Sequence, residues 1–282
     1  MSRVLACIDG SVYADSVADH AAWAAGRLGL SVELLQVLGR REAASSDRSG
    51  RIVAGARRRL LEELVTLDAQ RAKLVQREAR LGLEEAKVRL EEAGSADATI
   101  SLRNGDLLEM LAEHERDAEL VVVGKRGEAA DFATLHLGSN LERIVRASQR
   151  PVLVASRAFR PISKVVIGFD AGPSARKAVE AFATSPLYAG LDVVLVTVSE
   201  PTDSAQAALD EAASRIGSSG HHVETRIVPG KPEEVISSLL EEEEIDLLMI
   251  GAYGHSRLRS MVIGSTTSAL IRSCRVPVAI YR

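Results

Sequence analysis

The sequence has little of what marks several specialised protein classes. Its 282 residues contain only two cysteines, Cys7 and Cys274, which excludes a disulfide framework and a cysteine metal site. Cys7 falls in an expected core strand and Cys274 in a late helix, so we expect two buried structural thiols. The six histidines show no metal-ligand spacing, and no metal ligands are predicted.

Long apolar runs are also absent. No run approaches the roughly 18 residues of a membrane-spanning helix. The first expected strand begins within three residues of Met1, which leaves no room for a signal peptide before it. We therefore expect a soluble, cytoplasmic protein.

The chain also has no large excess of positive or negative charge. The formal net charge is −4 and the pI is near 5.9, which argues against a general nucleic-acid binder because such a protein carries a basic surface. The hydrophobic fraction of 46% and the charged fraction of 26% are those of a globular protein. The length is sufficient for two hydrophobic cores.

The common catalytic motifs are missing. There is no Gly-x-Ser-x-Gly elbow, no His-Glu-x-x-His and no paired-carboxylate pattern. The P-loop pattern is absent, which excludes a standard NTPase, and the Rossmann Gly-x-Gly-x-x-Gly is absent, which argues against a dehydrogenase. We predict no catalytic residues.

A glycine-rich segment near the end of the chain is the first positive signal. Gly251 and Gly254 follow the apolar run 246–250, and nine residues later Gly264 precedes Ser265 and Thr266. An expected strand, a glycine loop and a helix start form an arrangement that binds phosphate, because free N–H groups and the helix dipole face the anion. The alternative is an ordinary strand-to-helix connection.

The loop between these glycines carries His255, Arg257 and Arg259, and such cations suit a polyphosphate. A solvated, charged loop is the alternative. The Ser265 and Thr266 hydroxyls can contact phosphate, bind a metal ion on it, or simply cap the helix.

The chain repeats itself. The segment 117–156 has the same order of strand, glycine loop, helix and Pro-Val strand as 246–281, and residues 9–37 align without a gap with 170–198 at an offset of 161. This pattern indicates a tandem duplication of a domain of roughly 120–160 residues. We place the domains at 1–157 and 158–282, with residues 158–163 as the linker.

Each half alternates short apolar strands with helices. Because most strands are continuous apolar runs, we expect two doubly wound α/β domains, each with a five-stranded parallel sheet covered on both faces. The expected strands are 3–8, 31–37, 98–103, 119–123 and 151–155, then 164–169, 191–198, 222–228, 246–250 and 277–281. The expected helices include 12–28, 106–114, 173–184 and 231–242.

The first half contains an additional long helix, expected over about 50–93. Apolar residues recur every seven positions along it, at Leu60, Leu67, Leu74, Leu81 and Val88. Such a stripe packs against another helix or surface. The sequence leaves two arrangements open: the helix lies along its own domain, or it packs across a dimer interface.

An aspartate ends the first expected strand of each half, Asp9 in the first half and Asp170 in the second. The carboxyl edge of an open α/β sheet is where ligands bind, and a carboxylate there can accept hydrogen bonds from a ribose hydroxyl or an exocyclic amine. Capping the next helix is the alternative role. Val37 and Val198, at the ends of the second strands, can contact a base.

Together these residues resemble the universal stress protein family in its tandem two-domain form. The family's nucleotide-binding branch is marked by Gly-x2-Gly-x9-Gly-Ser/Thr, which Gly251, Gly254, Gly264 and Ser265 match in type and spacing. The resemblance covers both halves. It implies that the two domains pair side by side, as two copies of a single-domain member would, with the closing strands 151–155 and 277–281 as their mutual edges. It implies an ATP-binding α/β domain, with Mg²⁺ as a companion of the phosphates.

Carried over residue by residue, the resemblance places Asp170 and Val198 at the adenine and ribose, Gly251 and Gly254 along the ribose and phosphates, and Gly264, Ser265 and Thr266 at the phosphates. The first-half counterparts are Asp9, Val37, Gly124, Gly127, Gly138 and Ser139.

The first half departs from the pattern. Its loop, 128–137, has ten residues rather than nine and contains Glu128 and Asp131, which repel phosphate, while Lys125 and Arg126 offset them in part. Family members without the signature do not bind ATP, so the resemblance favours the second half as the nucleotide site.

Three functions follow as hypotheses. The first is a nucleotide-binding regulatory protein of the stress response, with weak ATP hydrolysis at most and an unknown protein partner. The second is an interaction protein, a homodimer among the options, that uses the long helix and retains vestigial glycine loops. The third is an enzyme of a related adenine-nucleotide fold, against which no substrate domain or catalytic residues are visible.

Overall fold

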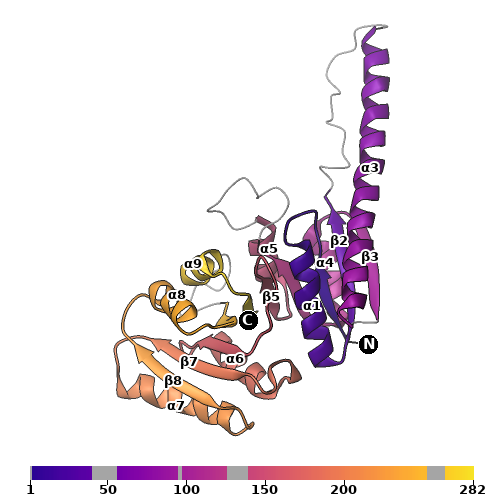
Figure 1. Cartoon of the computed structure of the whole chain (residues 1–282). Coiled ribbons are helices and arrows are strands. Elements are labelled where there is room, and N and C mark those ends of the chain that lie inside the picture. Colours follow the sequence, from indigo (N-terminus) through magenta and orange to yellow (C-terminus); the bar gives the residue numbers. More distant parts are fainter. Residues whose placement is uncertain (1, 40–55, 95–96, 126–138, 253–263) are drawn as a thin grey trace.

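The protein is described by a computed structural model over residues 2–39, 56–94, 97–125, 139–252 and 264–282, except for the side chains of residues 56–59, 61 and 139. Ten strands form one sheet in the order β3-β2-β1-β4-β5-β10-β9-β6-β7-β8 (Figure 1). The first five are β1 (Arg3–Cys7), β2 (Ser31–Leu38), β3 (Ala98–Asn104), β4 (Ala118–Gly124) and β5 (Val152–Ala155). The second five are β6 (Lys164–Gly168), β7 (Asp192–Val198), β8 (Val223–Val228), β9 (Leu247–Gly251) and β10 (Val278–Tyr281).

Helices cover both faces of this sheet. The first half has α1 (Ala14–Leu28), α3 (Ala56–Glu92), α4 (Leu107–His114) and α5 (Ser139–Ala147), with the 3₁₀ turn η1 (Glu115–Asp117). The second has α6 (Pro173–Thr184), α7 (Asp203–Gly217), α8 (Pro232–Glu242) and α9 (Ser265–Ser273), with η3 (Pro186–Tyr188). Within each half the paired strands are parallel, so the expected doubly wound α/β fold is confirmed.

All ten expected strands are present, each within one residue of its expected ends. Helix α7 is an element that the expected helices did not include. Thr202 caps it by accepting a hydrogen bond from Ala205 N at 3.2 Å. A threonine followed by an acidic residue and an alanine-rich run is a helix start that could have been recognised.

The two halves join through their closing strands, as expected. β10 pairs with β5 in antiparallel fashion, with Val278 opposite Val154 and Ile280 opposite Val152. The strands of the two halves therefore run in opposite directions, and their carboxyl ends lie at opposite edges of the shared sheet. Residues 156–163 connect β5 to β6 without helix or strand.

Two apolar layers run through both halves, one on each face of the sheet. Successive residues of a strand alternate between them: Val4 and Ala6 belong to one layer and Leu5 to the other. Each layer includes residues of both closing strands, such as Leu153 with Ala279 and Val154 with Val278. Burial on both faces explains why the strands are continuous apolar runs.

Reciprocal polar contacts fasten the join. Lys125, just after β4, donates to the carbonyl oxygen of Cys274 at 2.6 Å. In the opposite direction Arg282, just after β10, donates to the carbonyl oxygens of Arg146 and Ser148. Both sets of carbonyls lie at helix C-terminal ends, where a cation is favourable. Cys274 is buried as expected, whereas Cys7, the last residue of β1, is only half-buried.

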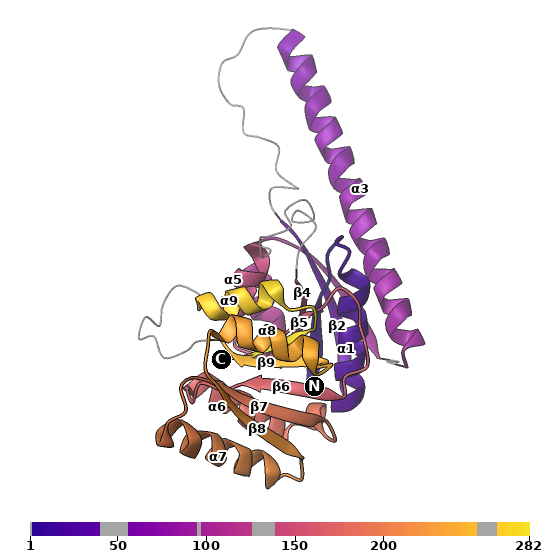
Figure 2. The ribbon, with the colours of Figure 1, turned by 60° about the vertical axis from the view of Figure 1, so that its left-hand side comes forward.

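The long helix α3 is present, and residues 50–55 of its expected range lie outside the described chain. Its last third packs on the first half through Ala79, Leu83, Ala86 and Leu90, all buried. Figures 1 and 2 show the rest of α3 projecting beyond the sheet and its covering helices. The face that packs does not include the apolar residues that recur every seven positions, so this stripe does not hold α3 on its own domain.

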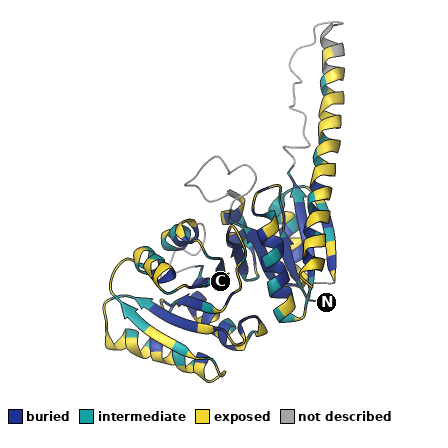
Figure 3. Ribbon diagram, viewed as in Figure 1, coloured by how far each residue is buried: buried dark blue, intermediate teal, exposed yellow. Residues whose placement is uncertain are grey.

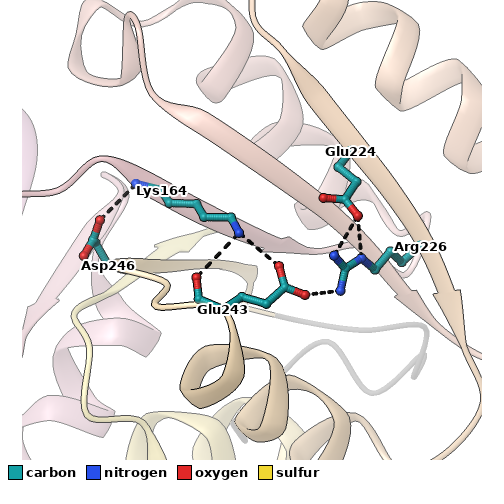
Figure 4. Close-up of polar contacts among 5 residues, drawn as sticks. All are labelled: Lys164, Glu224, Arg226, Glu243 and Asp246. Carbon is teal, nitrogen blue, oxygen red and sulfur yellow. Dashed lines mark hydrogen bonds and ion pairs between the residues drawn. The ribbon is translucent and has the colours of Figure 1, made fainter.

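A charged network closes the amino edge of the second half (Figure 4). Lys164 at the start of β6 donates from its ammonium to a Glu243 carboxylate oxygen at 3.0 Å and from its backbone N–H to Asp246 at 3.0 Å. Arg226 of β8 contacts both Glu243 and Glu224. Burial raises the pKa of Glu243, but the hydrogen bonds from Lys164 and Arg226 outweigh it and leave that pKa below its ordinary value.

The direction of this shift predicts a pH-dependent contribution to stability. A lowered pKa means that the Glu243 carboxylate stabilises the folded state above its unfolded pKa of about 4.3 and loses that effect as the pH falls through its folded pKa. Glu243→Gln is expected to lower the free energy of unfolding by about 1–2 kcal/mol at pH 7. Urea denaturation should show the deficit shrinking below about pH 4. Glu242→Gln, an exposed neighbour on α8, is the matched control, and a deficit unchanged at low pH would contradict the assignment.

Candidate functional site

The second half-sheet has a topological switch point at its carboxyl edge. β6 lies in the middle of this half, with β7 and β8 on one side of it and β9 and β10 on the other. A crevice at such a switch point is the usual ligand site of open α/β sheets. Here the ends of β6, β7 and β9 meet the first turns of α6 and α9.

A cavity of about 920 Å³ lies at this point, within the size range of small-molecule sites. Six of the nine expected second-half site residues line it: Asp170, Val198, Gly251, Gly264, Ser265 and Thr266. The other three, Gly254, His255 and Arg257, lie outside the described residues, as does Arg259. The structure therefore brings together every expected second-half site residue that it describes.

The strand-end aspartates adopt the same local geometry in both halves. An Asp170 carboxylate oxygen accepts a hydrogen bond from Gly172 N at 2.8 Å, and Asp9 accepts one from Ser11 N at 3.1 Å. In each case the carboxylate accepts a hydrogen bond from the backbone N–H two residues later, which is an Asx turn. The N-cap of the following helix is a different residue, Gly172 after Asp170 and Tyr13 after Asp9. The helix-capping alternative is thus wrong for both residues, and the exposed Asp170 lines the cavity.

The start of α9 forms one wall of the cavity. Gly264 is its N-cap and contributes no side chain, and the described residues supply no side-chain hydrogen bond to the first turn. By contrast, Asp106 caps α4 and Thr202 caps α7 through their side chains. The N–H groups of Ser265 and Thr266 can therefore receive an anion.

The described lining carries no cation. Its charged members, Asp170 and Glu200, are acidic and exposed. Any attraction for phosphate from these residues comes from backbone N–H groups and the α9 dipole. No group of three or more metal-binding side chains gathers within the described ranges.

Several lining residues escaped the sequence analysis. Thr197 donates from its hydroxyl to Phe169 O at 3.0 Å and ties the end of β7 to β6, while Thr267 donates to Gly251 O at 3.5 Å and ties α9 to β9. Ile236 of α8 adds an apolar wall. Thr197 and Thr267 are next to expected site residues in the sequence, so they could have been predicted to lie at the site. Ile236 reaches the cavity only because α8 packs there, which the sequence pattern does not indicate.

In the first half, Asp9, Val37 and Gly124 follow or end β1, β2 and β4 and lie at one edge of the sheet. Ser139 begins α5, and Gly127, Gly138, Arg126, Glu128 and Asp131 lie outside the described residues. Lys125 was expected to offset the acidic loop. Its ammonium donates to Cys274 O of the second half, so part of its charge acts at the end of α9, while the acidic loop itself lies outside the described residues.

The comparisons with known proteins agree with this architecture. The profile of the Universal stress protein family matches residues 1–156 and again 161–282. A universal stress protein of Synechocystis is 37% identical over 287 residues, covering 100% of both chains. Within the described residues, no helix is long and apolar enough to cross a membrane.

A solved structure shows the same fold over the length of the chain. A universal stress protein from Archaeoglobus fulgidus has a TM-score of 0.71 at 22% identity and covers 99% of this chain and 96% of its own. A shorter universal stress protein, solved in complex with cAMP, is 27% identical with a TM-score of 0.38 and covers 44% of this chain and 98% of its own. With two successive family matches and a full-length relative, the chain belongs to the universal stress protein family, in tandem two-domain form.

Proposed function

We propose that this chain is an ATP-binding regulatory protein of the stress response and that domain 2, residues 158–282, holds the nucleotide. The observation that carries the proposal is the convergence of Asp170, Val198, Gly251, Gly264, Ser265 and Thr266 on one cavity. These residues come from three strand ends and one helix start, and they include three of the four positions of the family's nucleotide-binding signature.

The cavity lining offers both apolar and polar groups, which suits a nucleotide. Val198 and Ile236 offer apolar contact to a base, and the Asp170 carboxylate can accept hydrogen bonds from a ribose hydroxyl or an exocyclic amine. The uncapped first turn of α9 suits the phosphates. Mg²⁺ would be held by the phosphates with a hydroxyl of Ser265 or Thr266.

Hydrolysis of ATP by this site would be weak. Asp170 already accepts a backbone hydrogen bond in its turn, and Glu200 is exposed at the rim. We assign neither the role of a base. Domain 1, residues 1–157, would bind nucleotide weakly or not at all, because its ten-residue loop carries two acidic residues.

Gly264→Val tests the site without disturbing the fold. Gly264 has φ −52°, and among the described residues the nearest atom to a Cβ there would be Thr267 Oγ1 at 3.7 Å. The larger side chain should occupy the phosphate position and reduce bound nucleotide at least about tenfold, or about 1.4 kcal/mol. Mass spectrometry of small molecules released from the denatured protein, purified without added nucleotide, measures the occupancy.

The control for this experiment is Gly217→Val at the far end of α7, where a Cβ would meet no atom of the described residues within 4 Å. It should retain the wild-type nucleotide content. If wild-type protein releases no adenine nucleotide and binds none when ATP is added back, the proposal fails.

The same measurement counts working sites. A content near one nucleotide per chain is expected, because only the second half keeps the full signature. A content near two that survives Gly264→Val at half its value would show that domain 1 binds, in contradiction to the assignment made from its loop.

Gly251→Ala should act through the fold instead. A Cβ at Gly251 would lie 2.8 Å from Ala175 N and 2.8 Å from Ser174 Cβ, so the start of α6 would have to move. We expect a loss of about 1–3 kcal/mol of unfolding free energy from this overpacking. Urea denaturation should show a smaller loss for Gly264→Val, about 1 kcal/mol or less, because valine is a poorer N-cap for α9 than glycine. Equal losses in both variants would show that Gly264 also has a packing role.

A further inference from the structure

Helix α9, whose start lines the domain 2 cavity, has little stability of its own. It has nine residues, about 13 Å at 1.5 Å per residue, and an isolated helix of this length is not stable in water. Residues 265–268, at its start, are serines and threonines, which have a lower helix propensity than alanine or leucine. Its N-cap is Gly264, and its first turn contains no acidic residue that would favour the helix dipole. Contacts with other elements must therefore hold α9 in place.

The second half holds α9 mainly by burying one side of it. The buried residues are Thr267, Leu270 and Ile271. Figure 3 shows that the helix is only partly buried, with exposed residues on its outer side. Its polar contacts with this half are long, since Thr267 donates to Gly251 O at 3.5 Å and the hydroxyls of Ser237 and Ser273 are 3.5 Å apart. Such distances are at the outer limit of a hydrogen bond.

A much shorter contact comes from the first half of the chain. The Lys125 ammonium donates at 2.6 Å to the carbonyl oxygen of Cys274, the C-cap residue of α9. A cation at a helix C-terminus interacts favourably with the helix dipole, most strongly where it is partly buried, and Lys125 is half-buried. Lys125 therefore stabilises α9 at the end opposite to the cavity.

The charge of Lys125 acts locally, at that end of the helix. Burial raises the pKa of the Cys274 thiol to about 11, and the positive charge of Lys125 acts in the opposite direction. A phosphate at the first turn of α9 would be about 13 Å away, the length of the helix, which exceeds the Debye length of about 8 Å at physiological salt. Direct attraction is thus screened, and Lys125 can affect phosphate binding mainly by holding the helix.

The same arrangement occurs on the other side of the domain join. Arg282, just after β10, donates to the carbonyl oxygens of Arg146 and Ser148 at 2.5 and 3.4 Å. These carbonyls lie at the end of α5, the domain 1 counterpart of α9. In both directions, a cation from one half holds the end of the helix that follows the glycine segment of the other half.

We propose that Lys125 is a positioning residue for the domain 2 nucleotide site and acts through α9, whose first-turn N–H groups receive the phosphates. The inference rests on the proposed function of that site. Lys125 follows Gly124 at the end of β4, so domain 1 contributes to the domain 2 site from its own glycine segment. Because α9 contacts the phosphates and not the base, loss of Lys125 should weaken the binding of ATP and leave that of adenosine unchanged.

Isothermal titration of the nucleotide-free full chain with ATP and with adenosine tests the proposal. Lys125→Met removes the charge and the donor but retains an unbranched side chain, and it should weaken ATP binding by about fivefold. Lys125→Arg retains the cation and should bind ATP within about twofold of the wild type. Adenosine binding should stay within about twofold of the wild type in both variants. Lys125→Gln, which retains a donor without the charge, should weaken ATP binding less than Lys125→Met and replaces it if that variant does not fold.

Lys87→Met is the matched control, because it removes the same charge from α3 of the same domain and should bind ATP as the wild type does. Equal ATP affinity in the wild type and Lys125→Met overturns the proposal. A parallel loss of adenosine binding also overturns it, because Lys125 would then support the whole domain and not its phosphate end. A wild type that binds no ATP overturns the proposed function, and this inference with it, so the wild-type titration distinguishes the two failures.

Discussion

The antiparallel pairing of β5 with β10 is the interaction on which the rest of the structure depends. Each of these strands has four residues, all buried, and each closes one half of the chain. Left unpaired, they would expose two apolar sheet edges, which are prone to aggregate. Paired, they make one sheet and allow both apolar layers to continue from one half into the other. The duplication therefore yields a single folded body.

The antiparallel join also determines where ligand sites can lie. Because the halves run in opposite directions, their carboxyl edges lie at opposite edges of the sheet. Each carboxyl edge is then next to the amino edge of the other half, which explains the reciprocal contacts of Lys125 with Cys274 and of Arg282 with Ser148. The Lys125 contact links the glycine segment of domain 1 to the end of α9, whose start lines the domain 2 cavity.

The two copies of the duplicated domain share one fold but differ in their loops, helices and cavities. Domain 2 has the cavity, and its sequence keeps the glycine and serine spacing of the family's nucleotide-binding signature. Domain 1 has a longer, acidic loop and a 37-residue helix. The cavity lies in the second half and α3 belongs to the first, so each can be altered by mutation while the other is left unchanged.

The sequence by itself determined the strands and the duplication, because continuous apolar runs and a repeated motif depend on local pattern alone. The contact between the closing strands was implied by the family resemblance and not by local pattern. The sequence also identified the residues that line the cavity from β6, β7, β9 and α9, since the ends of parallel strands meet at one edge. Only the tertiary structure decided which face of α3 is buried, because its periodicity carries two apolar stripes and the packing of Leu83 and Leu90 selects one. It likewise decided that Lys125 acts across the domain join and that Ile236 reaches the cavity, since contacts between distant segments depend on how whole elements are placed and not on their spacing in the chain.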